Sequence, residues 1–203
     1  MAEAPSPFAL LVGAAFAAAS GLALTNLWLQ HRRALARDRA HWAALAARRG
    51  WHLVERRDGF AVIGTAAGAS FHLSQGAVAH GDIGVFLETR LPRAPWLVCE
   101  LFASSPLAQT ARRPGQRVTL ARPPEGRADH YLQLWSNHRA QAPALIDEAV
   151  RGALAQLPRP YLLYQNGIVV LIWPCAALPG DTQLDAAIAC IDALARAYQK
   201  LSS

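Results

Sequence analysis

Two neighbouring residues, Cys99 and Glu100, have side chains that could act together in catalysis. They lie in Trp96–Ala103, a segment otherwise apolar on both sides, and this pattern predicts a central strand. A thiol needs a base within hydrogen-bonding reach to become a nucleophile. A buried cysteine is more often an apolar packing residue, and no phosphate-loop, nucleophile-elbow or zinc-protease motif occurs in the chain.

A second set of reactive side chains surrounds one predicted hairpin. Imidazole and carboxylate groups are metal ligands, and the alternation of a strand could bring two of them to one face. The residues are His72, His80, Asp82 and Glu88. Because ordinary polar clusters at loops and strand edges are far commoner than metal sites, and because no catalytic or cofactor motif occurs, we expect no metal, no cofactor and no catalytic residue. An enzyme that uses Cys99 or this region stays an alternative.

The longest uncharged stretch of the chain is Pro7–Leu29. As a helix it is long enough to cross the hydrocarbon core of a bilayer. A cleavable signal peptide would begin with basic residues and have a shorter apolar region, whereas Met1–Ser6 contains Glu3 and no basic residue. Residues 1–29 are therefore predicted to form a transmembrane anchor.

Basic residues follow this stretch and none precedes it, so the positive-inside rule places the C-terminal side in the cytoplasm and the N-terminus outside. We expect the chain to be a single-pass protein of the inner (cytoplasmic) membrane. A tryptophan and four arginines are predicted to lie at the interface and meet anionic lipid. They are Trp28, Arg32, Arg33, Arg37 and Arg39.

Small residues recur every fourth position within the predicted span. Such a ladder lets a second helix approach closely, which predicts packing against a membrane partner or a second copy of the chain. Its members are Ala9, Gly13, Ala17 and Gly21.

The net charge of +6 is concentrated beside the predicted membrane. Residues 31–57 hold eight arginines against Asp38 and Glu55, which equals the net charge of the whole chain. No nucleic-acid-binding motif accompanies these arginines, so nucleic acid is an unlikely partner. A second basic group lies in the Pro- and Gly-rich segment 104–127, which is typical of a solvated loop; the alternative is that this group binds a partner or lipid. It comprises Arg112, Arg113, Arg117 and Arg122.

The remaining chain predicts an α+β domain. Residues 30–50 continue the anchor as a basic stalk helix, which ends at Gly50. Residues 51–203 form the cytoplasmic domain, a mainly antiparallel sheet packed against two C-terminal helices. Asp58-Gly59 and Asn166-Gly167 predict tight hairpin turns. Strands are expected at 51–56, 60–64, 70–73, 83–91, 96–103, 117–121, 131–136, 161–164 and 168–173.

The two C-terminal helices are predicted from periodic apolar residues. The first begins at Pro143 and extends to Leu157. The second begins at Asp181 or Thr182, with Thr182 and Asp185 as a capping box. Three cysteines without a close pair suit a reducing compartment.

These features predict a non-catalytic accessory, assembly or scaffold subunit of a membrane protein complex. The alternative binding function is a module for a small or lipidic ligand, held between the sheet and the helices beneath Trp96, Trp135 or Trp173. The third class is the enzyme described above.

Overall fold

The structure is a computed structural model, and it describes nine segments of the chain. They are residues 7–57, 59–78, 82–91, 98–103, 116–119, 132–137, 141–165, 167–175 and 177–202. Within them, side chains are described except at residues 7–22, 102–103, 116–119, 132–133, 135 and 202.

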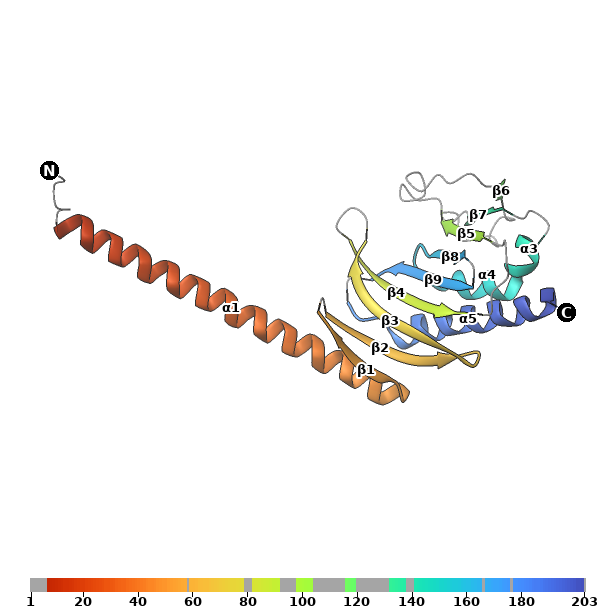
Figure 1. Ribbon diagram of the computed structural model, residues 1–203, viewed down its shortest axis with the longest axis horizontal. Coiled ribbons are helices and arrows are strands. Elements are labelled where there is room, and N and C mark those ends of the chain that lie inside the picture. Colours follow the sequence, from red (N-terminus) through yellow and green to blue (C-terminus); the bar gives the residue numbers. More distant parts are fainter. Residues whose placement is uncertain are drawn as a thin grey trace.

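Helix α1, Pro7–Arg49, is a single helix of 43 residues. Most of it projects away from the domain, and only its last turns lie against the sheet (Figure 1). It ends where the sequence predicts, at Gly50, whose φ of 67° is the left-handed conformation of a C-terminal cap. The Trp51 amide then donates to the Ala46 carbonyl at 2.8 Å and turns the chain back.

The predicted span, Pro7–Leu29, is helical along its whole length. The side chains of residues 7–22, which include the small-residue ladder, lie outside the described residues. Among the residues that are described, no helix is long and apolar enough to cross a membrane. The assignment of this segment as a span therefore stays a prediction.

The described strands form one antiparallel sheet of nine, in the order β1-β2-β3-β4-β9-β8-β5-β7-β6. The first four strands form a meander, and the β8–β9 hairpin lies between β4 and β5 (Figure 1). The strands are β1 His52–Arg56, β2 Gly59–Ala66, β3 Ala69–Ala77, β4 Ile83–Arg90, β5 Val98–Ala103, β6 Gln116–Thr119, β7 Leu132–Ser136, β8 Tyr161–Gln165 and β9 Ile168–Pro174. The predicted antiparallel sheet is confirmed.

Alternation along the strands gives the sheet a buried face and an outer face. In β4, Val85 and Leu87 are buried and Glu88 and Arg90 are exposed. Ile83 alternates with Val85 and Leu87 but is 47% exposed, because it begins the strand.

Three helices follow the strand β7 instead of the two predicted. Helix α3, Ala142–Leu145, and helix α4, Glu148–Leu154, replace the single helix expected from Pro143 to Leu157. The break occurs because Ile146 leaves the helical conformation and the Asp147 side chain accepts a hydrogen bond from the Val150 amide at 3.0 Å. Asp147 thereby begins a new helix as its N-cap.

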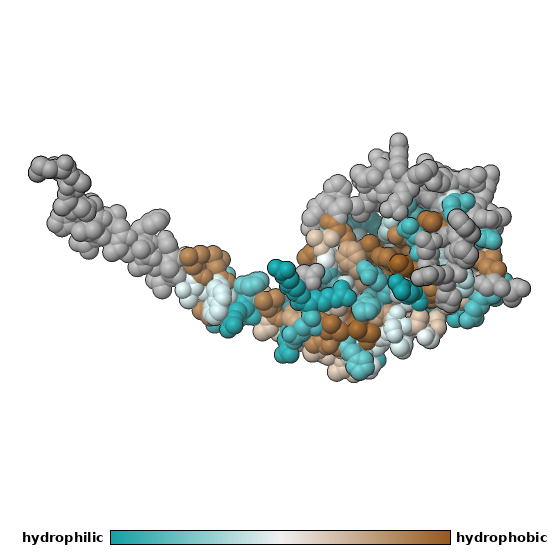
Figure 2. Space-filling model, in the orientation of Figure 1, coloured by the Kyte–Doolittle hydropathy of each residue, from teal (hydrophilic) through white to brown (hydrophobic). Residues whose placement is uncertain are grey.

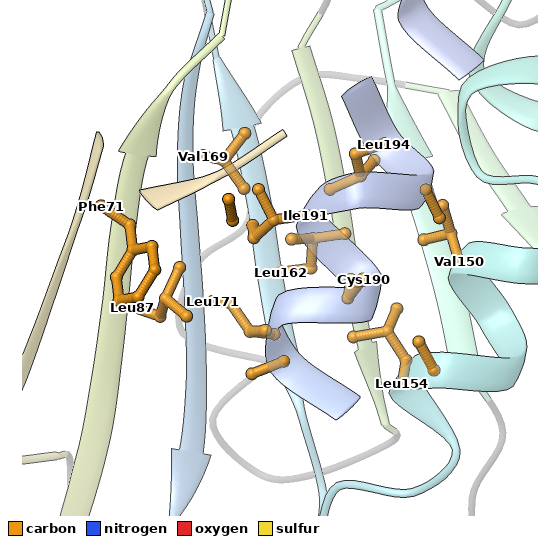
Figure 3. Close-up of a cluster of buried hydrophobic side chains, with 14 of the residues drawn as sticks. Phe71, Leu87, Val150, Leu154, Leu162, Val169, Leu171, Cys190, Ile191 and Leu194 are labelled. Carbon is orange, nitrogen blue, oxygen red and sulfur yellow. The ribbon is translucent and has the colours of Figure 1, made fainter. Parts of the chain in front are cut away.

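Helix α5, Asp181–Ser202, is the central element of the core. Figure 3 shows it between the strands and α4, with Ile191 and Leu194 among buried side chains from both. Leu162 and Leu171 from the sheet and Leu154 from α4 complete the contact. Helices α3 and α4 both contact α5.

Candidate functional site

The part of α1 that leaves the domain has large apolar side chains that are 41–67% exposed. Of the seven exposed large hydrophobic residues in the described part of the chain, five lie in this one segment. We call it the apolar segment; its members are Leu24, Leu27, Trp28, Leu29 and Leu35. A run of exposed apolar side chains of this kind marks an interaction surface for lipid or protein.

Two members of the apolar segment, Leu24 and Leu35, continue the face by which α1 docks on the domain. Leu24, Leu35 and Trp42 are separated by 11 and 7 residues, close to whole turns of a helix, so they share one face. Trp42 is only 3% exposed, and Leu45 and Ala46 are buried with it. The last turns of the predicted stalk are therefore part of the domain core, and the same face is uncovered further toward the N-terminus.

The predicted interface arginines lie beside this segment. The Arg32 guanidinium carbon is 4.5 Å from the centroid of the Trp28 ring, a cation–π contact that contributes about 0.5–1 kcal/mol at an exposed site. Arg37 donates from Nε to the Arg33 carbonyl at 3.3 Å. Arg39 is directed to the domain, where its Nε lies 2.6 Å from Glu55 Oε1.

A second arginine cluster ties the end of α1 to the start of α5. Arg49 donates to Asp181 at 2.8 Å and to Asp185 at 2.5 Å, and Arg48 lies 3.3 Å from Asp181. The hydrogen bond from Arg49, with the charge of Arg48, lowers the pKa of the Asp181 carboxyl. Hydrogen bonds to Asp185 and Asp181 raise the pKa of Arg49. The Arg49 side chain is 22% exposed and lies over the Trp51 ring at 5.8 Å.

Sequence reasoning missed this cluster. The predicted capping box assigned Asp185 to Thr182, whereas its carboxylate pairs with Arg49, 136 residues earlier. The available signal was the pair of acidic residues one helical turn apart, Asp181 and Asp185, in a chain with an Arg48-Arg49 pair. Nothing local indicates that these two pairs meet.

Cys99 and Glu100 point to opposite faces of β5. The Cys99 thiol is buried and donates to Ser136 Oγ at 3.5 Å, and its desolvation raises the pKa to about 11. Glu100 accepts a hydrogen bond from the Tyr161 hydroxyl at 2.5 Å. The structure does not bring this thiol and this carboxylate together as nucleophile and acid.

His72 and Glu88 are directly opposite one another on β3 and β4, so alternation does place two of the four predicted residues on one face. His72 Nδ1 lies 3.2 Å from a guanidinium nitrogen of Arg56. Asp82 is exposed ahead of β4, and His80 lies outside the described residues. In the described segments, no group of three His, Cys, Asp or Glu residues could hold a metal ion.

The alternative expectation was a ligand held between the sheet and the helices beneath one of three tryptophans, and it stays a prediction. Trp173 is fully buried there, together with the leucines and isoleucines of Figure 3. Trp96 and the side chain of Trp135 lie outside the described residues.

The basic loop falls mostly on residues that are not described. Arg112, Arg113 and Arg122 lie outside them, and of Arg117 only the backbone, in β6, is described. Its role as a partner-binding segment stays a prediction.

No protein-family model and no curated protein matches this chain. Among solved structures, the crystal structure of the mycobacterial trehalose monomycolate transport factor A, TtfA, is similar with a TM-score of 0.52. The alignment covers 82% of this chain and 96% of that chain at 12% sequence identity. At this identity the similarity is one of fold.

Proposed function

We propose that this protein is a single-pass, membrane-anchored accessory or assembly subunit of a membrane protein complex, without catalysis of its own. The observation that carries the proposal is the apolar segment of α1, whose large side chains are exposed where the helix leaves the domain. An apolar helix surface of this kind requires lipid or another protein around it. The uncharged sequence of Pro7–Leu29 extends that surface toward the N-terminus.

The distribution of arginines supports an inner-membrane location with the domain in the cytoplasm. Arg32, Arg33 and Arg37 follow the uncharged stretch, whereas residues 1–6 contain no basic residue. Trp28 lies where an interfacial aromatic residue is expected.

The proposal is tested by photo-crosslinking in the native membrane. A photoreactive amino acid at Gly13 or Gly21 lies on the small-residue face, and at Ala15 or Leu22 it lies on the opposite face. We expect crosslinks to an integral membrane protein from Gly13 and Gly21 and only lipid adducts from Ala15 and Leu22. Mild-detergent purification should recover the same protein.

Lipid adducts alone from all four positions, with recovery of the chain as a lone monomer, would contradict the accessory role. They would leave the anchor itself intact, because lipid contact is what an isolated span makes.

A further inference from the structure

The arginines close to the proposed membrane fall into two groups by what they contact. Three are held in ion pairs within the protein: Arg39 with Glu55, and Arg48 and Arg49 with the carboxylates of α5. The other five are exposed, and no ion pair joins them to a carboxylate among the residues that the structure describes. We call these the exposed arginines: Arg32, Arg33, Arg37, Arg56 and Arg57.

Two of the exposed arginines are not on α1 but at the tip of the β1–β2 hairpin. Strand β1 folds back along α1. The Trp51 amide donates a hydrogen bond to the Ala46 carbonyl near the end of α1, and Glu55, further along β1, accepts one from Arg39, which lies earlier on the helix. The hairpin turn therefore points toward the N-terminal end of α1, as Figure 1 shows at the end of β1.

The distance along α1 places this turn near the proposed membrane surface. Ten helical residues from Leu29 to Arg39 rise about 15 Å. Arg57 lies two residues beyond Glu55, at the turn that follows β1, and an extended chain of two residues brings it about 7 Å nearer to the membrane. Arg57 then lies about 8 Å beyond the hydrocarbon core, while the headgroup layer extends about 5–7 Å from it. An arginine side chain spans the remaining gap.

We propose that the β1–β2 turn is a second membrane contact, in which Arg56 and Arg57 bind anionic lipid headgroups beside Arg32, Arg33 and Arg37. The contact rests on the proposed function, since it takes Pro7–Leu29 as the span. Each basic side chain near an anionic leaflet is attracted to it. The sheet is then held at a fixed angle to the bilayer by two contacts, the helix and the hairpin tip.

The residues around the β1–β2 turn leave it with a net positive charge. The contact of Arg56 is with an imidazole nitrogen of His72, not with a carboxylate. The acidic Glu55 is already paired with Arg39. Asp58 lies outside the described residues. In the sequence its negative charge offsets one of the two arginines, so residues 56–58 together keep a net positive charge.

The test is hydrogen–deuterium exchange of the full chain in lipid nanodiscs. One set of discs contains only phosphatidylcholine, and the other also contains phosphatidylglycerol. We expect slower exchange at residues 55–60 in the anionic discs. In the double variant Arg56→Gln/Arg57→Gln, the factor by which anionic lipid slows this exchange should be about thirtyfold smaller, since both charges are removed. Added salt should weaken it as well.

Arg48→Gln is the matched control, because it removes an exposed arginine that is held by Asp181 and should keep the protection. Equal exchange in both kinds of disc, or protection that survives the double variant, would overturn the second contact. Failure of the chain to co-elute with either disc would instead contradict the anchor, and with it both proposals.

Discussion

Arg49 is the residue at which the anchor helix meets the C-terminal helix. Its guanidinium group bonds to Asp181 and Asp185 and lies over Trp51, so it joins three segments that are distant in sequence. Exposed single ion pairs contribute little to stability, but a network around one mostly covered arginine contributes more. We expect Arg49→Ala to reduce the free energy of unfolding by about 1 kcal/mol.

The stability difference between wild type and Arg49→Ala should also depend on pH. The folded pKa of Asp181 is lowered from its ordinary value of 3.8, mainly by the hydrogen bond from Arg49. A carboxyl group of this kind stabilises the folded state above its unfolded pKa and loses that effect as the pH falls through the folded pKa. The raised pKa of Arg49 keeps the arginine charged throughout.

Urea unfolding at a series of pH values measures this prediction. The two proteins should differ at neutral pH and converge as the pH falls below 3.8. Arg48→Ala is the control and should change stability by less than about 0.5 kcal/mol, because Arg48 makes a single exposed pair. A difference that is constant from neutral pH to pH 2 would show that the Asp181 pair is not its source.

At the scale of elements, the docking of α1 depends on one large side chain. Trp42 is 3% exposed and lies in the core cluster with residues of the sheet. Removal of a buried aromatic side chain costs about 3–5 kcal/mol. We expect Trp42→Ala to destabilise the domain by that amount, as measured by urea unfolding in mild detergent.

Leu35→Ala is the matched control for this change. Leu35 lies on the same helix face, two turns earlier, but it is 41% exposed. Its truncation should leave the stability of the domain unchanged within about 0.5 kcal/mol. Equal losses from both variants would mean that the domain covers the apolar segment as well as the end of α1.

The elements that could be predicted from the sequence are those that a few neighbouring residues determine, such as tight turns and helix ends. The β8–β9 hairpin follows from Asn166-Gly167, since Gly167 adopts a φ of 81° and Gln165 pairs directly with Ile168. The end of α1 follows in the same way from Gly50. The break between α3 and α4 was not predicted, because the apolar pattern continues through it and only the capping of Val150 by Asp147 marks it.

The order of the strands and the docking of α1 depend on contacts between distant residues. The β8–β9 hairpin lies between β4 and β5, which are its neighbours in space but not in the chain. No turn or periodicity encodes such a position, since a strand edge accepts any partner of suitable register. For the same reason, the sequence revealed the arginines of residues 31–57 but not which of them face carboxylates.

At the scale of the whole molecule, the two surfaces on which the proposals rest lie toward the end from which α1 projects. Figure 2 shows apolar surface on the described part of α1 that projects from the domain, and Arg56 and Arg57 lie at the β1–β2 turn, which points along α1 in the same direction. This one-sided arrangement suits a domain that contacts a membrane with that side. It also makes the orientation of the chain in the bilayer the property on which both proposals depend.

Orientation is tested with a reporter that is active only in the cytoplasm, fused after Ser203. We expect activity, because Arg32, Arg33 and Arg37 follow the proposed span and the positive-inside rule predicts that such a flank stays in the cytoplasm. A variant that replaces these three arginines with glutamine and adds three arginines within residues 2–6 should show reduced activity, since the charge bias is reversed. The same glutamine changes without the added arginines are the control, with an intermediate result. A reporter that is active only outside the cytoplasm can be fused at the same position. If it were active on the wild-type chain and the cytoplasmic reporter were not, the cytoplasmic placement would be contradicted.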